Sequence, residues 1–385
     1  MDKIIICKEC FKSNYIKEHI AHNVEITVDK CIICNRHNGI DLMKNEKILE
    51  MITNLIAYNY SLLEYSRNFG MAISTRFGNI FGEDNPIFNG KLNDDIGITL
   101  LKNIKTTKSS VVDHWTLPFK FVKSSVLIRL EKELSKKNYY EVIDDYMEII
   151  KKHLSKVILN ELEDDELYRA RIGFNTKIVD AEGDLENRKI SFPYIKDELE
   201  APPPMKASSG RFNKLGCSFL YLASDKETAI AEIKPDPGQI CSVGTFKIIE
   251  KKQFIDLRKR AIDSIPVEDG LETKNLIDSF ARLFSEAVPK EETHKYFVTQ
   301  FLSEIFRTLG YSGIMYDSPQ NDGEGYNVIC YYPDMFRLIE NSEEMFKIEK
   351  VKYKISDALF DERKKYKYFE FKNEEDRKKY GEEDY

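Results

Sequence analysis

The sequence predicts an α+β protein, in which a cysteine-rich module and a helical region precede a domain of mixed strands and helices. Two Cys-x-x-Cys pairs lie before residue 35, and helical spacing of apolar residues dominates from about residue 44 to residue 157. Short β-branched and aromatic runs bounded by turn residues appear after Glu166. A chain of 385 residues is too long for one ordinary core, so more than one domain is expected.

Composition and charge narrow the class of protein. Hydrophobic residues make up 42% and charged residues 32%, as in globular proteins. No apolar run approaches the roughly 20 residues of a membrane helix, and the start is too polar for a secretory signal. A cytoplasmic protein without a membrane partner is therefore expected. The net charge of -7 also argues against nucleic acid as a partner, because phosphate-binding proteins are usually basic.

The first module, residues 1–40, is expected to be a zinc-ribbon-like unit. Cys7 and Cys10 form one pair, Cys31 and Cys34 form the other, and 20 residues separate the pairs. Two such turns can surround one tetrahedral ion with four thiolates, which leaves no position for water and makes the site structural. Zinc is the expected metal, although another thiophilic ion and four plain core cysteines stay open. The nearby histidines are expected at the surface: His19, His22 and His37.

Residues 41–160 are expected to form a helical domain. Apolar residues recur at helical spacing over Lys44–Phe69 and again over Lys120–Val157, where one face carries Tyr139, Val142, Ile143, Tyr146, Ile149, Ile150 and Leu154. The glycine-rich stretch Phe77–Leu101 predicts a loop. Such amphipathic helices must pack on each other or on the next domain.

The following domain, residues 165–345, combines strands and helices. We expect its boundary between Val157 and Tyr168, a loop or linker at Ala201–Pro204, and a charged tail over residues 346–385. Short apolar runs predict strands over Phe219–Ala223, Ile240–Ile249, Gln253–Leu257, Gly313–Tyr316 and Tyr326–Tyr332. Helical spacing predicts two helices, Glu272–Ala287 and His294–Leu309, the second capped by Gly310.

Five chained motifs distinguish this domain. They are Tyr168-Arg169-Ala170-Arg171, Gly210-Arg211-Phe212-Asn213, Phe219–Ser224, Thr228–Glu232, and Tyr316-Asp317-Ser318-Pro319 followed by Gly325-Tyr326-Asn327-Val328. Their order and spacing over roughly residues 165–340 resemble the RES domain family, which is called after its Arg, Glu and Ser. The resemblance implies an ADP-ribosyltransferase-like split β-sheet with NAD in its cleft.

The resemblance also implies an activity and a set of site residues. Family members cleave the nicotinamide–ribose bond of NAD, and water, inorganic phosphate or, in some relatives, a protein takes the ADP-ribosyl group. Carried onto this sequence, the catalytic residues are Arg211, Tyr221, Glu232 and Ser318. The residues expected to bind NAD are Arg169, Arg171, Asn213 and Asn327.

The residue types suit this chemistry. Bond cleavage builds oxocarbenium-like charge on the ribose, which a carboxylate such as Glu232 stabilises. Arg211 offers a planar cation to the pyrophosphate. Tyr221 can pack against nicotinamide or ribose, and Ser318 can donate to a phosphate or a ribose. Each has a plainer alternative: Arg211 paired with a surface carboxylate such as Asp225, Tyr221 in the core, Glu232 in solvent, and Ser318 in a turn.

The expected function is an intracellular toxin-like or defence enzyme that cleaves NAD by hydrolysis or phosphorolysis. The alternatives are a protein ADP-ribosyltransferase and a catalytically silent module that senses NAD or binds a macromolecule. An antitoxin or regulatory protein is an expected partner, and a homo-oligomer stays open. The helical region resembles HEPN-like extensions in pattern only, and it lacks their arginine–histidine dyad, so RNase activity is not expected. If residues 1–160 restrain the enzyme, their deletion should change NAD consumption.

Overall fold

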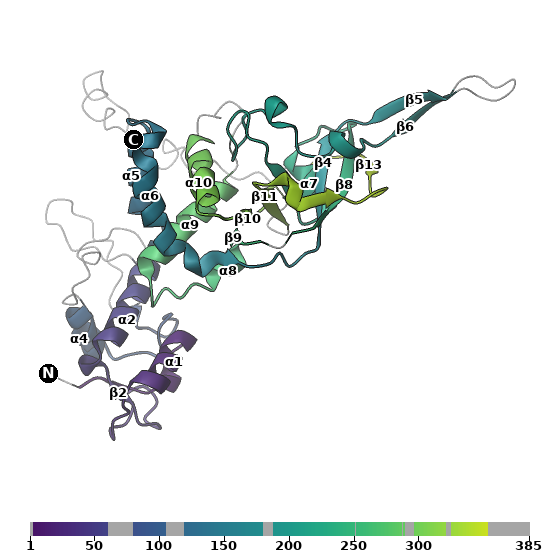
Figure 1. Ribbon diagram of the computed structural model, residues 1–385. Coiled ribbons are helices and arrows are strands. Elements are labelled where there is room, and N and C mark those ends of the chain that lie inside the picture. Colours follow the sequence, from purple (N-terminus) through teal and green to yellow (C-terminus); the bar gives the residue numbers. More distant parts are fainter. Residues whose placement is uncertain are drawn as a thin grey trace, which may run out of the picture.

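The computed structural model shows a mixed α+β protein (Figure 1), so the predicted fold class is confirmed. It describes residues 3–60, 80–104, 119–179, 188–250, 252–286, 288, 296–320 and 325–352. Within these ranges, no helix combines the length and the apolar character needed to cross a bilayer.

The N-terminal module is built on a short antiparallel pair of strands. β1 (Ile5–Ile6) pairs with β2 (Ile40–Asp41), and α1 (Asn14–Asn23) begins at Ser13, whose side chain accepts a hydrogen bond from the Ile16 amide. α2 (Glu46–Asn59) follows and is buried along most of its length. The helix predicted over Lys44–Phe69 is thus confirmed over Glu46–Asn59. It ends at Tyr60, whose backbone is extended, and residues 61–69 of that prediction lie outside the described residues.

The loop predicted over Phe77–Leu101 is wrong from Asp94 onward, where α4 (Asp94–Ile104) begins. The Asn93 side chain accepts a hydrogen bond from the backbone amide two residues later, which is a typical helix start. Gly97 suggested a break, but it lies inside the helix. A Cβ at Gly97 would come within 3.0 Å of the Phe81 ring, so the glycine serves close packing.

The predicted helical block Lys120–Val157 forms two helices, α5 (Ser125–Leu134) and α6 (Tyr139–Leu154). Asn138 starts α6 with a capping box, in which Glu141 bonds back to the Asn138 amide. The predicted face of α6 is confirmed for its five buried residues, Tyr139, Val142, Tyr146, Ile150 and Leu154, whereas the other two predicted residues, Ile143 and Ile149, are half-buried. These helices pack against α9 (Leu271–Ser285) and α10 (Tyr296–Thr308).

A mixed nine-stranded sheet forms the centre of the second half (Figure 1), with strand order β12-β8-β4-β7-β11-β10-β9-β3 and with β13 paired to β8. Only β9 and β10 run parallel among the described pairs of this sheet. The strands are β3 (Ile158–Leu159), β4 (Glu166–Ile172), β7 (Leu220–Ala223), β8 (Ile240–Ile248), β9 (Phe254–Asp256), β10 (Gly313–Asp317), β11 (Tyr326–Cys330), β12 (Phe336–Leu338) and β13 (Glu344–Lys347). The five predicted strands and two predicted helices of this region are confirmed.

The sheet divides between β4 and β7. β4 pairs with β8 along its whole length, but it meets β7 only where Tyr168 faces Ala223. Arg169 and Arg171 alternate with Ala170, a pattern typical of an edge strand. β4 nevertheless lies inside the sheet, between β8 and β7. The opening beyond Tyr168 is covered by the short helix α7 (Lys226–Glu232), which packs on β4 and β7.

Two further features were not predicted or were left open. β5 (Asn175–Val179) and β6 (Arg188–Phe192) form a separate hairpin that extends away from the sheet (Figure 1). The segment Ala201–Pro204 is a loop of the sheet domain, where the Ser218 hydroxyl donates to the Pro202 carbonyl at 2.6 Å.

The helices of residues 41–160 contribute to two different cores. α2 and α4 share a core with the cysteine module, and this core also includes Val267 and Leu271 at the start of α9. α5 and α6 share the other core with α9 and α10. α9 therefore joins both cores, and the domain boundaries drawn from the sequence stay a prediction.

Candidate active site

A cavity of about 350 Å³ opens where β4 and β7 separate. β4, β7, α7 and the loop after β10 form its walls, together with the Arg211 loop and the start of α10. Its polar and charged lining residues are Tyr168, Arg169, Arg211, Tyr221, Glu232, Lys234, Tyr296, Tyr316, Gln320 and Asn327. This volume lies within the range of small-molecule sites, which is roughly 300–1,000 Å³.

Glu232 is the last residue of α7, and two neighbours fix its carboxylate. Asp225 caps α7 by accepting from the Thr228 amide at 2.7 Å. The Ser318 hydroxyl and the Asn327 amide both donate to Glu232 Oε1, at 2.6 and 2.7 Å. Oε2 makes no hydrogen bond to any described residue, so this oxygen is available to a ligand.

Arg169 and Arg211 bring two guanidinium groups to the cavity. Arg169 donates to the Tyr221 carbonyl at 3.1 Å, and Arg211 donates to the Leu283 carbonyl of α9 at 2.7 Å. The Nε atom of each arginine is buried and has no hydrogen-bond partner among the described residues. Burial and, second, the charge of Arg171 lower the pKa of Arg169 to about 10, so the side chain stays cationic at neutral pH. Buried donors without partners are rare, and a bound anion would satisfy them.

Tyr221 holds the loop that carries Arg211. Its hydroxyl donates to Asn213 Oδ1 at 2.6 Å and accepts from the Phe212 amide at 3.4 Å. Asn213 in turn donates to the carbonyls of Ser208, Lys214 and Cys217. Burial raises the pKa of the Tyr221 hydroxyl, which keeps it a neutral donor.

Most of the predicted site residues therefore lie at the cavity, and Asn213 and Arg171 do not. Arg169, Arg211, Tyr221, Glu232 and Asn327 line the cavity, and the buried hydroxyl of Ser318 reaches it through Glu232. Asn213 uses its amide to close the Arg211 loop. Arg171 points elsewhere, because it donates to the Glu198 carbonyl at 2.6 Å and lies over the Tyr194 ring.

The sequence did not single out several residues of the cavity. Tyr168 and Tyr316 belong to the quoted motifs and face the cavity with Tyr296. Burial, and then the nearby Glu232 carboxylate, raise the pKa of Tyr316. Lys234 follows Glu232 in a left-handed conformation, with φ of 49°, an unusual backbone for a residue other than glycine. With Lys234, the described residues of the cavity comprise three cations and one carboxylate, which favours an anionic ligand.

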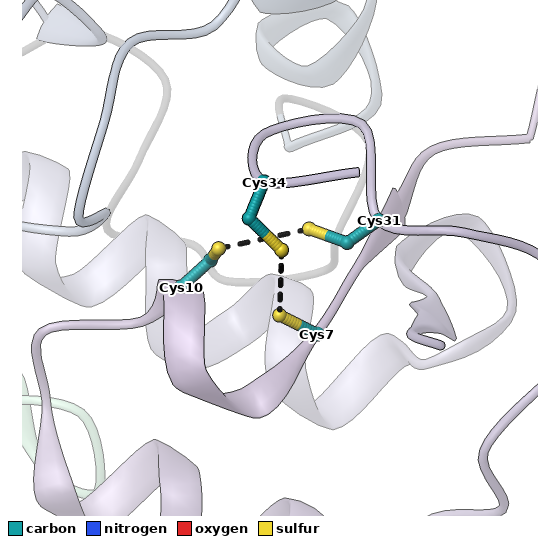
Figure 2. Close-up of side chains that lie close together, drawn as sticks. All are labelled: Cys7, Cys10, Cys31 and Cys34. Carbon is teal, nitrogen blue, oxygen red and sulfur yellow. Dashed lines mark hydrogen bonds between the residues drawn. The ribbon is translucent and has the colours of Figure 1, made fainter. Parts of the chain in front are cut away.

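The four cysteines of the N-terminal module converge (Figure 2). All four sulfur atoms lie within 4.8 Å of one another; the Cys7–Cys34 and Cys10–Cys31 sulfur pairs are 3.6 and 3.7 Å apart. A tetrahedral ion with zinc–sulfur bonds of about 2.3 Å has edges of about 3.8 Å, so the arrangement fits zinc. His37 lies beside the cluster, with Nδ1 3.6 Å from the Cys34 sulfur.

The comparison with known families agrees with this geometry. Residues 188–349 match the RES domain family. The chain contains a RES domain. The matched residues include the Arg211 loop, Glu232, Ser318 and Asn327, whereas β4 with Arg169 lies before them.

Two other comparisons add little to the RES domain assignment. A solved structure of an M. tuberculosis MbcT–MbcA toxin–antitoxin complex shares 13% identity over 52% of this chain and 92% of that chain, with a TM-score of 0.29. That likeness is too slight to carry an argument. No curated protein matches the chain.

Proposed function

We propose that the RES domain binds NAD and cleaves its nicotinamide–ribose bond, as part of a toxin-like or defence function. One observation carries the proposal: a carboxylate held by two donors lines the same cavity as two arginines, whose buried Nε atoms have no partner among the described residues. The cations suit a pyrophosphate, and the fixed carboxylate suits a ribose that becomes positively charged. The ADP-ribosyltransferase-like character of the divided sheet belongs to the same proposal.

Each residue has a role in the proposed cleavage. Arg169 and Arg211 bind the pyrophosphate. Glu232 Oε2 lies near the nicotinamide ribose and stabilises the oxocarbenium-like charge, while Ser318 and Asn327 hold the carboxylate through Oε1. Nicotinamide leaves as a neutral group, so the enzyme needs little acid catalysis. Water or inorganic phosphate then bonds to the ribose carbon and loses a proton to solvent.

The test is NAD turnover by the full chain, with the products identified in buffers with and without phosphate. Free ADP-ribose in both buffers means hydrolysis, and a phosphorylated ADP-ribose only with phosphate means phosphorolysis. Label retained on protein in a cell extract would instead indicate a protein ADP-ribosyltransferase. Binding of NAD without release of nicotinamide, in each of these conditions, would contradict the proposed cleavage.

Glu232→Gln tests the assigned role directly. The variant should lose about 10²-fold or more of kcat and still bind NAD, because it removes charge stabilisation from the transition state. The matched control is Glu227→Gln, an exposed residue of the same helix that does not line the cavity. An active Glu232→Gln enzyme would refute the role of the carboxylate.

We propose two binding partners, a protein and a metal ion. An enzyme that consumes NAD needs restraint, so we infer an antitoxin or regulatory protein as a binding partner. We also infer that Cys7, Cys10, Cys31 and Cys34 hold a structural zinc ion, since the sulfur spacing fits one. Zinc would supply no step of the proposed reaction, because four thiolates close its coordination sphere.

A further inference from the structure

A second cavity adjoins the first, and the N-terminal region forms its outer wall. It encloses about 300 Å³, and it shares Arg211, Val288 and Tyr296 with the first cavity. Arg211 therefore lies between the two cavities. The outer wall consists of Lys123 and Glu131, which lie before and within α5. Neither residue belongs to the part of the chain that matches the RES domain.

The two cavities differ in charge. Among the described residues that line the first cavity, three are cations, Arg169, Arg211 and Lys234, and one is a carboxylate, Glu232.

Among the described residues that line the second cavity, Glu131 and Glu286 balance the charges of Lys123 and Arg211. The other described lining residues are Leu283, Val288, Tyr296, Val298 and Thr299. A phosphate is therefore favoured on the side of the first cavity. An uncharged group with a flat apolar part and several hydroxyls suits the second, and a nucleoside has these properties.

Glu131 can accept hydrogen bonds from such hydroxyls. Lys123 Nζ donates to both of its carboxylate oxygens at 2.9 Å, which fixes the carboxylate at the wall of the cavity. A carboxylate has about four acceptor positions, so two donor contacts leave capacity for ribose hydroxyls. In dinucleotide sites, a carboxylate accepts from the ribose 2′-hydroxyl, whereas a 2′-phosphate needs an arginine.

We propose that the second cavity binds the nucleoside remote from the bond that is cleaved, and that Glu131 selects a ribose with free hydroxyls over a 2′-phosphorylated one. The N-terminal region thereby completes the substrate site and favours NAD over NADP. This inference rests on the proposed function, since it names the dinucleotide as the ligand of both cavities. It adds a specificity-determining residue that lies outside the RES domain match.

The experiment compares the full chain with its Glu131→Gln variant on NAD, NADP and nicotinamide mononucleotide, which lacks the remote nucleoside. Loss of one charge-assisted hydrogen bond should raise the KM for NAD about tenfold, with kcat unchanged. The KM for the mononucleotide should stay the same, and the preference for NAD over NADP should fall about tenfold. The control is Glu133→Gln, another residue of α5 in an ion pair with lysine, which lines neither cavity.

The outcomes separate this inference from the proposed function. If Glu131→Gln retains the KM for NAD, or impairs NAD and the mononucleotide equally, the inference is wrong while the cleavage activity stands. If the wild type cleaves neither substrate, the proposed function fails. In that case, calorimetry measures the affinity of wild type and Glu131→Gln for ADP-ribose and for its 2′-phosphate. Equal affinities of the two proteins for each ligand would overturn the nucleoside site.

Discussion

Replacing Tyr221 with phenylalanine tests whether its hydroxyl serves the Arg211 loop. The change removes one oxygen atom and keeps the ring, which packs against Phe212 with centroids 6.4 Å apart. Two contacts are lost: the 2.6 Å bond to Asn213 Oδ1 and the longer bond from the Phe212 amide. Both partners belong to residues that are almost fully buried, at 5% and 1% exposure, so water replaces the hydroxyl poorly.

The magnitude follows from these contacts. A buried acceptor left without a donor costs about 1–3 kcal/mol, and the 3.4 Å contact adds little. We expect Tyr221→Phe to lower the free energy of unfolding by about 2 kcal/mol. The loop that carries Arg211 should then be less well fixed, so the KM for NAD should rise more than kcat falls.

Urea denaturation of the full chain measures the stability change, and the NAD assay measures the kinetic change. Asn213→Ala completes a double-mutant cycle with Tyr221→Phe, and a coupling energy of about 0.5–3 kcal/mol is expected for residues in direct contact. Tyr140→Phe is the control, because Tyr140 is 81% exposed. Additive effects of the two loop changes would refute the loop function. A loss of kcat at unchanged stability would instead place the hydroxyl on the substrate.

Three further predictions concern stability. Cys31→Ser should abolish binding of zinc, measured by elemental analysis of the purified chain, and should lower the melting temperature; an unchanged metal content would contradict the four-thiolate site. His153 bonds to Thr273, and burial lowers its pKa below the ordinary value of 6.5, so folding favours its neutral form and stability should fall as the pH decreases below 6.5. His153→Gln should reduce that loss in pH-dependent denaturation, and an unchanged profile would exclude this group as the cause. Asp256→Asn should cost about 3 kcal/mol in urea denaturation, because buried Arg258 keeps its charge without its bidentate partner; a cost below about 1 kcal/mol would contradict this.

The strands and helices of the sheet domain were predictable because each has a local signal. β7 is a continuous run of apolar and aromatic residues, and β8 is rich in apolar and β-branched residues. Gly310 after α10 adopts φ of 93°, as expected for a residue that ends a helix. α4 was missed because its glycine suggests a break unless the packing against Phe81 is known. β5 and β6 were missed because their side chains are mostly exposed and follow no buried alternation.

The candidate site was predictable as a set of residues but not as a set of contacts. Arg211 and Glu232 come to one cavity, as their motifs suggested. Ser318 and Asn327 bond to Glu232, although the sequence favoured direct roles toward NAD. Which polar group meets which depends on the register of β10 and β11 and on the end of α7, which no local pattern specifies.

The contribution of the helical region to the cavity was also beyond sequence reasoning. Glu131 follows Lys123 by eight positions on a plainly amphipathic segment, and nothing in that segment indicates Arg211 as a spatial neighbour. Deleting residues 1–160 is therefore a poor test of whether this region restrains the enzyme. The deletion would also remove Tyr146 and Ile150 of α6 from the core that they share with α9 and α10. Single substitutions such as Glu131→Gln leave that core intact.

The position of α9 in the chain sets the order in which the two cores can form during translation. The core around the cysteine module includes Val267 and Leu271, so it cannot form completely until the chain has been synthesised past Leu271. α5 and α6 can complete their core only later, when α10 has been synthesised. Arg211 gains its contact with the Leu283 carbonyl only after α9 has been synthesised. A nascent chain would thus carry the four clustered cysteines early, and the cavity that Arg211 and Glu232 line would be completed only after β10 and β11 have been synthesised.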